Sequence, residues 1–246
     1  MKKIQHRLYV NSALPGSGML TLRPDQSHYL GNVMRVTIGD AVALFNGRDG
    51  EWAAEVTELK KKAVCLRITG QTKDQKPESD LMLAFAPIKK ARIDFIAQKA
   101  TELGVGHLQP IITRRTNVER VKTERLISNA IEAAEQCERL TVPVVSDPIK
   151  LEKLLAGWPD ARMIMFCDED LSGKSAHFAL ADLPPSQRER PWAIFIGPEG
   201  GFDDDERAAI KAKANTVVVS LGPRVLRADT AAMAAISLWQ SAIGDW

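Results

Sequence analysis

The sequence predicts an α/β domain with a mostly parallel sheet, preceded by a small β-barrel domain. Three observations on the 246 residues carry this prediction. The first third contains short segments with strand periodicity, residues 70–80 contain no large apolar side chain, and the remainder alternates apolar segments with helical ones. We therefore expect a barrel domain at residues 1–72 and an α/β domain at residues 73–246.

Several strands and one short helix are expected in the first third. In Ala63–Thr69 apolar and polar residues alternate with period two, which predicts a strand with one exposed face. The segment Asn46–Gly50 is rich in residues that tolerate positive φ and predicts a hairpin turn. The other expected elements are strands at His6–Val10, Gly18–Leu22, Ala41–Phe45 and Glu51–Leu59 and a helix at Asp25–Met34 with Asp25 as its cap.

After residue 80 the apolar segments lose their polar alternation, which is typical of strands buried on both faces of a parallel sheet. Strands are predicted at Leu81–Ala86, Leu108–Ile112, Val142–Val145, Met163–Cys167, Trp192–Ile196 and Val217–Leu221. Helices are predicted at Arg92–Leu103, ended by Gly104, and at Glu124–Glu138, Leu151–Leu155, Asp205–Ala214 and from Thr230 onward.

Composition excludes several classes of protein. A net charge of +2 gives no general argument for nucleic-acid binding, so an RNA surface would have to come from local basic clusters. Cys65, Cys137 and Cys167 and the four histidines show no metal-ligand spacing, and we expect the cysteines to be small core residues and no metal. No signal peptide or membrane span is recognisable, which predicts a cytoplasmic location.

The most informative segment follows the strand at 192–196. This first loop, Gly197–Phe202 (GPEGGF), lies at the carboxyl end of a strand, where open α/β sheets bind ligands. Its glycines let the backbone approach a ligand closely, although a tight strand-to-helix turn is the simpler alternative. Asp203 should cap the next helix, with Glu206 completing a capping box. Acidic residues at this helix start disfavour a phosphate, whereas they would not disfavour a ligand with a sulfonium cation and no phosphate.

A second loop, Leu221–Arg227 (LGPRVLR), follows the last predicted strand. Glycine and proline end the strand, two arginines come next, and Asp229 or Thr230 is expected to cap an alanine-rich helix. Such small residues let another backbone pack closely.

Together these two loops closely resemble those of the SPOUT class of methyltransferases, and within it the RsmE family of small-subunit ribosomal RNA uracil-N3 methyltransferases. Further matching segments are Gln98–Val105, Glu135–Arg139, Arg7, and His28–Leu30 with Val33–Arg35, so the resemblance covers essentially the whole chain. One departure is Asp229, where the family pattern has Glu, which shortens the carboxylate by one methylene.

The resemblance implies a PUA-like barrel, a trefoil-knotted catalytic domain, S-adenosylmethionine as cofactor, and a homodimer that acts on 16S ribosomal RNA of the small ribosomal subunit. The residues that would hold the cofactor, largely through main-chain groups, are Ile196, Gly197, Glu199, Gly201, Leu221, Gly222, Leu226 and Arg227.

The implied reaction sets the candidate catalytic residues. Uracil N3 must lose its proton, and charge must be stabilised on O2 and O4, a task suited to guanidinium groups. Arg139 and Arg227 are the preferred candidates, with Arg224 behind them, and Glu199 or Asp229 could accept the proton. The alternatives are phosphate binding by Arg224 and Arg227, capping of its own loop by Glu199, and a buried polar pair of Gln136 with Arg139.

RNA contacts are expected from basic residues in both domains: Arg7, Arg35, Lys89, Arg92, Arg114, Arg115 and Arg224. The run Lys60, Lys61 and Lys62 is better explained as a solvated face.

Two rival functions remain, a ribose 2′-O methyltransferase of the SPOUT class and a non-catalytic RNA-binding or ribosome assembly protein. Cofactor titration and identification of the methylated nucleoside would separate the three.

Overall fold

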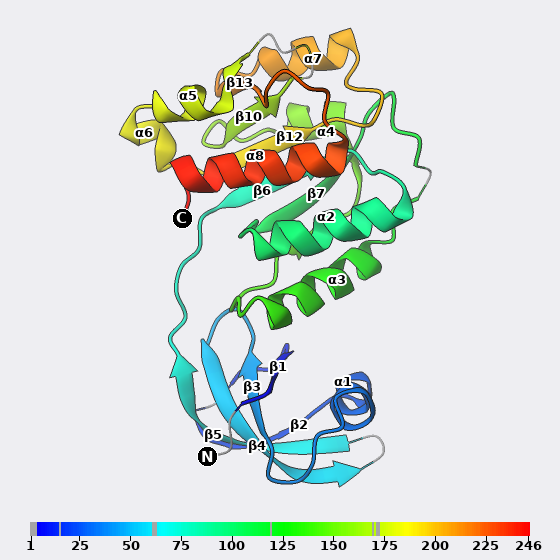
Figure 1. Ribbon diagram of the computed structural model, residues 1–246, viewed down its shortest axis with the longest axis vertical. Helices are drawn as coiled ribbons and strands as arrows, with labels where there is room; N and C mark the ends of the chain where they lie inside the picture. Colours follow the sequence, from blue (N-terminus) through cyan, green and yellow to red (C-terminus); the bar gives the residue numbers. More distant parts are fainter. Residues whose placement is uncertain (1–3, 15, 61–62, 119, 169, 171–172) are drawn as a thin grey trace. The chain divides into compact units, whose positions relative to one another are not determined.

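The computed structural model describes residues 4–14, 16–60, 63–118, 120–168, 170 and 173–246 (Figure 1). Lys61 and Lys62 of the predicted lysine run lie outside these residues. The chain divides into two compact units. The first is Met1–Pro77 with Ala134–Val142, and the second is Glu78–Ala133 with Pro143–Trp246. Helix α3 (Thr123–Gln136) begins in the second unit, and its last residues belong to the first.

The first unit is built on a five-stranded sheet in the order β1-β3-β4-β5-β2. β1 pairs with β3 in parallel, and the other neighbours are antiparallel. In β5 the residues Val64, Leu66 and Ile68 are buried, as the period-two pattern predicts. The strands are β1 (His6–Tyr9), β2 (Gly18–Thr21), β3 (Ala41–Phe45), β4 (Glu51–Lys60) and β5 (Ala63–Lys73). β5 thus continues past residue 70 into the segment without large apolar side chains, because its pairing with β4 extends to Lys73.

The turn between β3 and β4 has the predicted chemistry. The side chain of Asn46 accepts hydrogen bonds from the backbone N–H groups of Arg48 and Asp49, and Gly47 and Gly50 have positive φ. The expected helix at 25–34 is instead a short α1 (Pro24–His28) that continues as a π-helical turn, η1 (Tyr29–Val33). Asp25 is not its cap, since the helix begins one residue earlier, at a proline suited to a first turn.

The second unit contains an eight-stranded sheet. Seven strands follow the order β11-β13-β10-β12-β6-β7-β8, β9 pairs with β7, and all pairs are parallel. The strands are β6 (Leu81–Phe85), β7 (His107–Ile112), β8 (Val144–Val145), β9 (Ile149–Lys150), β10 (Met163–Cys167), β11 (Lys174–Ser175), β12 (Trp192–Ile196) and β13 (Thr216–Ser220). The chain therefore inserts β12 between the earlier strands β6 and β10.

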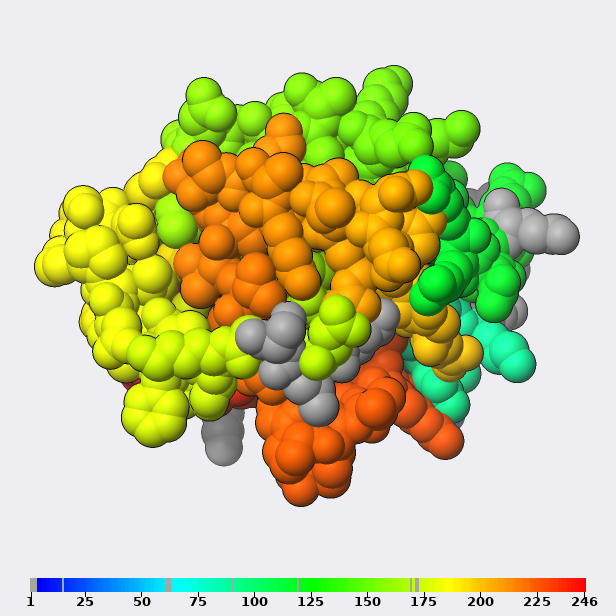
Figure 2. All heavy atoms as spheres, turned by 90° about the horizontal axis from the view of Figure 1, so that it is seen from above, coloured from blue at the N-terminus to red at the C-terminus, as the bar shows by residue number. Residues whose placement is uncertain are grey.

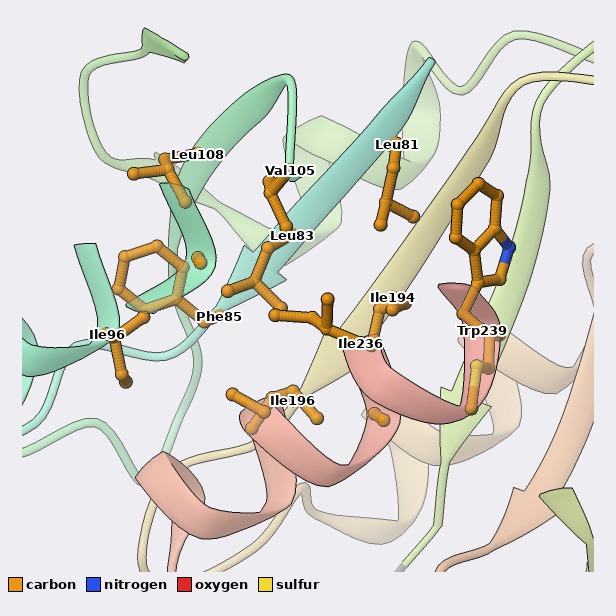
Figure 3. Close-up of a cluster of buried hydrophobic side chains, with 14 of the residues drawn as sticks. Leu81, Leu83, Phe85, Ile96, Val105, Leu108, Ile194, Ile196, Ile236 and Trp239 are labelled. Carbon is orange, nitrogen blue, oxygen red and sulfur yellow. The ribbon is translucent and has the colours of Figure 1, made fainter. Parts of the chain in front are cut away.

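Helices cover both faces of this sheet (Figure 1). Leu83 of β6 and Ile194 of β12 pack on one face with Ile96 of α2 and Ile236 and Trp239 of α8 (Figure 3). The alternate strand residues face α4 and α7 in a second apolar cluster. Burial on both faces explains why these strands lack polar alternation.

The helices of the second unit are mostly those expected. They are α2 (Lys90–Glu102), α3, α4 (Leu151–Ala156), α5 (Ala176–Ala181), α6 (Pro185–Arg188), α7 (Asp204–Lys211) and α8 (Ala228–Ala242). α5, α6 and the two-residue strands β9 and β11 were not predicted, since segments this short show little periodicity. Gly104 follows α2 with φ 86°, as expected of a glycine that ends a helix.

Three smaller findings concern residues named from the sequence. Cys137 is exposed and is not the core residue expected, because it lies beyond the end of α3; Cys65 and Cys167 are half-buried. Burial raises the pKa of the Cys167 thiol. In the described part of the chain no helix is long and apolar enough to cross a bilayer, and no group of three potential ligands could hold a metal ion.

Candidate active site

A pocket of about 350 Å³ lies at the carboxyl ends of β10, β12 and β13. The first and second loops, which follow β12 and β13, provide most of its wall, and the starts of α2 and α8 complete it. We call it the loop pocket. Its lining residues are Arg92, Cys167, Asp168, Ile196, Gly197, Pro198, Glu199, Leu221, Gly222, Arg224, Val225, Leu226, Arg227, Ala228 and Ala231. The structure thus brings the two predicted loops to one site.

Gly197 and Gly201 of the first loop are each favoured as glycine for a different geometric reason. A Cβ on Gly197 would come within 3.0 Å of the Phe202 ring, so the loop needs glycine to fold back on itself. Gly201 has φ 69°, and its N–H donates to the carbonyl of Pro198 at 2.9 Å, which closes a turn. Gly201 does not line the loop pocket, unlike the other seven residues proposed from the resemblance.

The start of α7 is capped as predicted. The carboxylate of Asp203 accepts from Glu206 N–H at 2.8 Å, and Glu206 accepts from Asp203 N–H at 3.0 Å. These interactions hold the pKa of Asp203 below its usual value, chiefly through the hydrogen bond from the Glu206 backbone.

Two arginines that were expected to bind RNA contact the first loop and α7 in the structure. Arg115 donates to the carbonyl of Gly200 at 2.9 Å. Arg114 lies 2.8 Å from Asp203 and 2.7 Å from Asp205, and these carboxylates raise its pKa. Figure 2 shows the green segment after β7 lying against the yellow-orange segment after β12. Arg114 and Arg115 therefore hold the first loop and the start of α7 in position.

Asp168 is a pocket residue that the sequence argument missed. It directly follows β10, its side chain is 1% exposed, and it lies 2.8 Å from Arg207 and 2.6 Å from Lys211. Arg207 and Lys211 are four residues apart on one side of α7. Asp168 therefore ties α7 to the end of β10. Its position after an apolar strand, at the ligand-binding edge of the sheet, was the available signal.

The second loop leads into α8. Gly222 has φ 110°, which favours glycine, and Val225 is 89% exposed at the tip of the loop. The helix begins at Ala228 with Arg227 as its N-cap residue. Asp229 and Thr230 are thus inside the first turn and neither is the cap, contrary to the prediction.

Arg92, which lines the loop pocket, lies near two carboxylates. Arg92 of α2 forms an ion pair with Glu199 at 2.6 Å and lies 3.8 Å from Asp229. Glu199 therefore pairs with a neighbouring helix, and the alternative that it caps its own loop has no support in the described contacts.

Two predicted arginines belong to the first unit. Arg7 is 10% exposed, forms an ion pair with Glu51 at 2.7 Å, and donates to the carbonyls of Ala134, Glu135 and Arg139. This environment indicates a structural role, not an RNA contact. Arg139 follows the end of α3, and its guanidinium donates to the hydroxyl of Thr141. The alternative of a buried pair with Gln136 is wrong, because Gln136 is exposed.

Family models match both parts of the chain. An RNA methyltransferase domain matches residues 74–240, and an RNA methyltransferase PUA domain matches residues 22–69. A ribosomal RNA small subunit methyltransferase E from Rickettsia conorii is 34% identical over 94% of this chain and 93% of its own length. One from Bacillus subtilis is 29% identical over 87% and 86%. The chain belongs to the ribosomal RNA small subunit methyltransferase E family.

Solved structures agree with this assignment. The enzyme of this family from Neisseria gonorrhoeae, bound to S-adenosyl methionine, has a TM-score of 0.87 and 29% identity over 98% of this chain and 99% of its own. A putative methyltransferase from Legionella pneumophila, in complex with the same cofactor, has a TM-score of 0.85 and 32% identity over 98% of each chain. The predicted fold class, a SPOUT-type α/β domain after a PUA-like barrel, is confirmed.

Proposed function

We propose that the protein transfers the methyl group of S-adenosylmethionine to N3 of a uridine in 16S ribosomal RNA of the small ribosomal subunit. The observation that carries this proposal is the convergence of the first and second loops on one pocket, in a chain whose relative of similar fold was solved with that cofactor.

The lining of the loop pocket fits the proposed cofactor. Ile196, Leu221 and Leu226 offer apolar surface for an adenine ring, and the glycines leave main-chain groups accessible. Basic and acidic side chains both line the pocket, as expected for a ligand that carries a carboxylate, an ammonium and a sulfonium. The bound cofactor would supply an electrophilic methyl group. We assign its binding to Ile196, Gly197, Glu199, Leu221, Gly222, Leu226 and Arg227, and give Gly201 the role of shaping the turn.

The protein's own groups must orient the uracil and stabilise the charge left on it. Arg227 lines the loop pocket, and no described side chain forms an ion pair with it, so its guanidinium is available to a carbonyl oxygen of the base. We propose the same role for Arg139 at the second carbonyl. Each tenfold gain in N3 acidity requires ~1.4 kcal/mol of differential stabilisation, which one charge-assisted hydrogen bond can provide.

A carboxylate would then accept the N3 proton, either directly or through water. Glu199 and Asp229 both lie beside Arg92. Glu199 pairs with Arg92 at 2.6 Å, whereas Asp229 is 3.8 Å away and accepts from Thr230 N–H. Because Asp229 is one methylene shorter than Glu, we retain Glu199 as the preferred acceptor.

We propose fewer RNA contacts than we expected from the sequence. Arg7, Arg114 and Arg115 have protein partners, and Arg92 is committed to Glu199. Arg35, Lys89 and Arg224 are exposed, and none has an ion-pair partner among the described residues. We propose these three as RNA contacts, together with a homodimeric state and a cytoplasmic location.

The test combines two measurements. Calorimetric titration should show binding of S-adenosylmethionine, and labelled cofactor incubated with small subunits from a strain lacking this protein should label 16S RNA. Nucleoside analysis should give N3-methyluridine. A 2′-O-methylated nucleoside would indicate the ribose methyltransferase, and cofactor binding without label would indicate a non-catalytic protein.

A further inference from the structure

A second pocket, of about 200 Å³, lies beside the first turn of α2. We call it the α2 pocket. Its floor is apolar, because Ile88, Ile93 and Leu126 line it and are at most 8% exposed. The remaining lining residues are Lys89, Asp94, Val118, Arg120, Val121, Lys122 and Arg125. The pocket is smaller than the loop pocket.

The rim of the α2 pocket is strongly basic. Among the described residues that line it, four are basic and one is acidic. The acidic residue of this described set, Asp94, is bound by Arg125 at 2.7 and 2.5 Å and by the amide of Asn129 at 3.0 Å. Lys89, Arg120 and Lys122 are exposed, and no ion pair joins them to other side chains in the described part of the chain. The rim therefore suits an anion.

The two pockets lie on neighbouring sides of the same helical turn. Arg92 lines the loop pocket, whereas Ile93, the next residue of α2, lines the α2 pocket. Consecutive helical residues project about 100° apart. The two pockets are therefore separated only by the first turn of α2.

We propose that the α2 pocket receives the base of a nucleotide of the RNA substrate, next to the uridine that is presented to the cofactor of the loop pocket. The base lies on the floor formed by Ile88, Ile93 and Leu126, and the phosphates bind Lys89, Arg120 and Lys122. An apolar floor with a positively charged rim complements a planar base with anionic phosphates. This inference rests on the proposed function, and it adds a recognition site outside the cofactor pocket.

The test measures binding of a short fluorescein-labelled oligouridylate by anisotropy at several salt concentrations. A second oligonucleotide of equal length has abasic sites at alternate positions. Wild-type protein should bind the abasic chain about tenfold more weakly, since an abasic site has no apolar ring face to bury on the floor of the pocket. Val118→Trp, a half-buried loop residue at the pocket wall, should fill the pocket and make the two affinities similar.

A second variant tests the rim without filling the pocket. Arg120→Glu with Lys122→Glu should lower the salt slope of binding by about 2, one for each lost phosphate contact. Lys150→Glu with Lys153→Glu reverses two exposed charges elsewhere in the same unit and should leave the slope and the base dependence unchanged. Cofactor affinity, measured by calorimetry, should be the same in all variants, which separates this inference from the proposed function.

Two outcomes would overturn the inference. One is equal salt slopes for the rim and control variants, together with unchanged base dependence in Val118→Trp. The other is a wild-type dimer in sedimentation that dissociates in Val118→Trp without any loss of RNA affinity, which would assign the α2 pocket to a second copy of the chain.

Discussion

The guanidinium of Arg115 donates a hydrogen bond of 2.9 Å to the carbonyl oxygen of Gly200, which joins the turn after β7 to the middle of the first loop. Arg114, the preceding residue, binds Asp203 and Asp205 at the start of α7. The first loop is therefore fixed from outside the pocket that it lines.

Arg115→Ala should weaken binding of S-adenosylmethionine about tenfold, because a hydrogen bond from a charged donor is worth ~1.5–3 kcal/mol and part of that is lost to solvent at an exposed site. Affinity for RNA should change little. Calorimetry and anisotropy measure the two constants. The matched control is Arg67→Ala, which removes an exposed arginine paired with Glu55 in the first unit. Equal cofactor affinity in both variants would show that Arg115 does not position the loop.

Arg139→Ala should retain cofactor binding and lose most methylation. We expect a fall of about 10²–10³ in kcat, the usual cost of removing one donor that stabilises developing charge. Single-turnover methylation of small subunits measures the effect. Normal turnover would remove Arg139 from the mechanism, whereas partial rescue by Arg139→Lys would support an electrostatic role.

Arg7→Ala should destabilise the first unit by about 3–5 kcal/mol, because it leaves the carboxylate of Glu51 buried without its principal partner. Lys73, 3.8 Å from Glu51, is too distant to replace it fully. Urea unfolding gives the difference in free energy. Arg23→Ala, which removes an exposed ion pair with Asp25, should cost less than about 1 kcal/mol. Similar losses in the two variants would contradict the structural role of Arg7.

The stability that the Asp203 cap contributes to the protein should depend on pH. The folded state holds the pKa of Asp203 below its usual value of 3.8, so the ionised cap stabilises the protein above that pH. This contribution is lost as the pH falls through the lower, folded pKa. Asp203→Ala should therefore have a lower Tm than wild type at neutral pH, and the two Tm values should converge in strong acid. A constant difference at all pH values would exclude this linkage.

Much of the fold could be predicted because its signals are local. β10 and β12 match their predicted bounds, since uninterrupted apolar segments bounded by polar residues define them. The caps at Gly104 and Asp203 follow from backbone chemistry at single residues. The predicted start of α8 was wrong. Arg227 occupies the N-cap position without a side-chain cap hydrogen bond, and Asp229 and Thr230, which follow it, are residue types that usually occupy that position.

The site was less predictable than the fold. The role of each of its charged side chains depends on an ion-pair or hydrogen-bond partner that lies far away in the sequence. A basic pair such as Arg114 and Arg115 has the same local pattern whether it binds RNA or a loop some 85 residues later. The ion-pair partners of Asp168, which are Arg207 and Lys211 of α7, likewise lie far from it in the sequence. Periodicity and capping carry no information about such pairings.

The order of strands has a consequence for biosynthesis. β6 and β10 leave the ribosome before β12, the strand that separates them, and the wall formed by Ala228 and Ala231 follows later still. In a nascent chain that has reached only β10, no strand yet fills the position between β6 and β10. Competence to hold a ligand in the loop pocket is therefore acquired late in translation, and a polypeptide interrupted before α8 would be made without it.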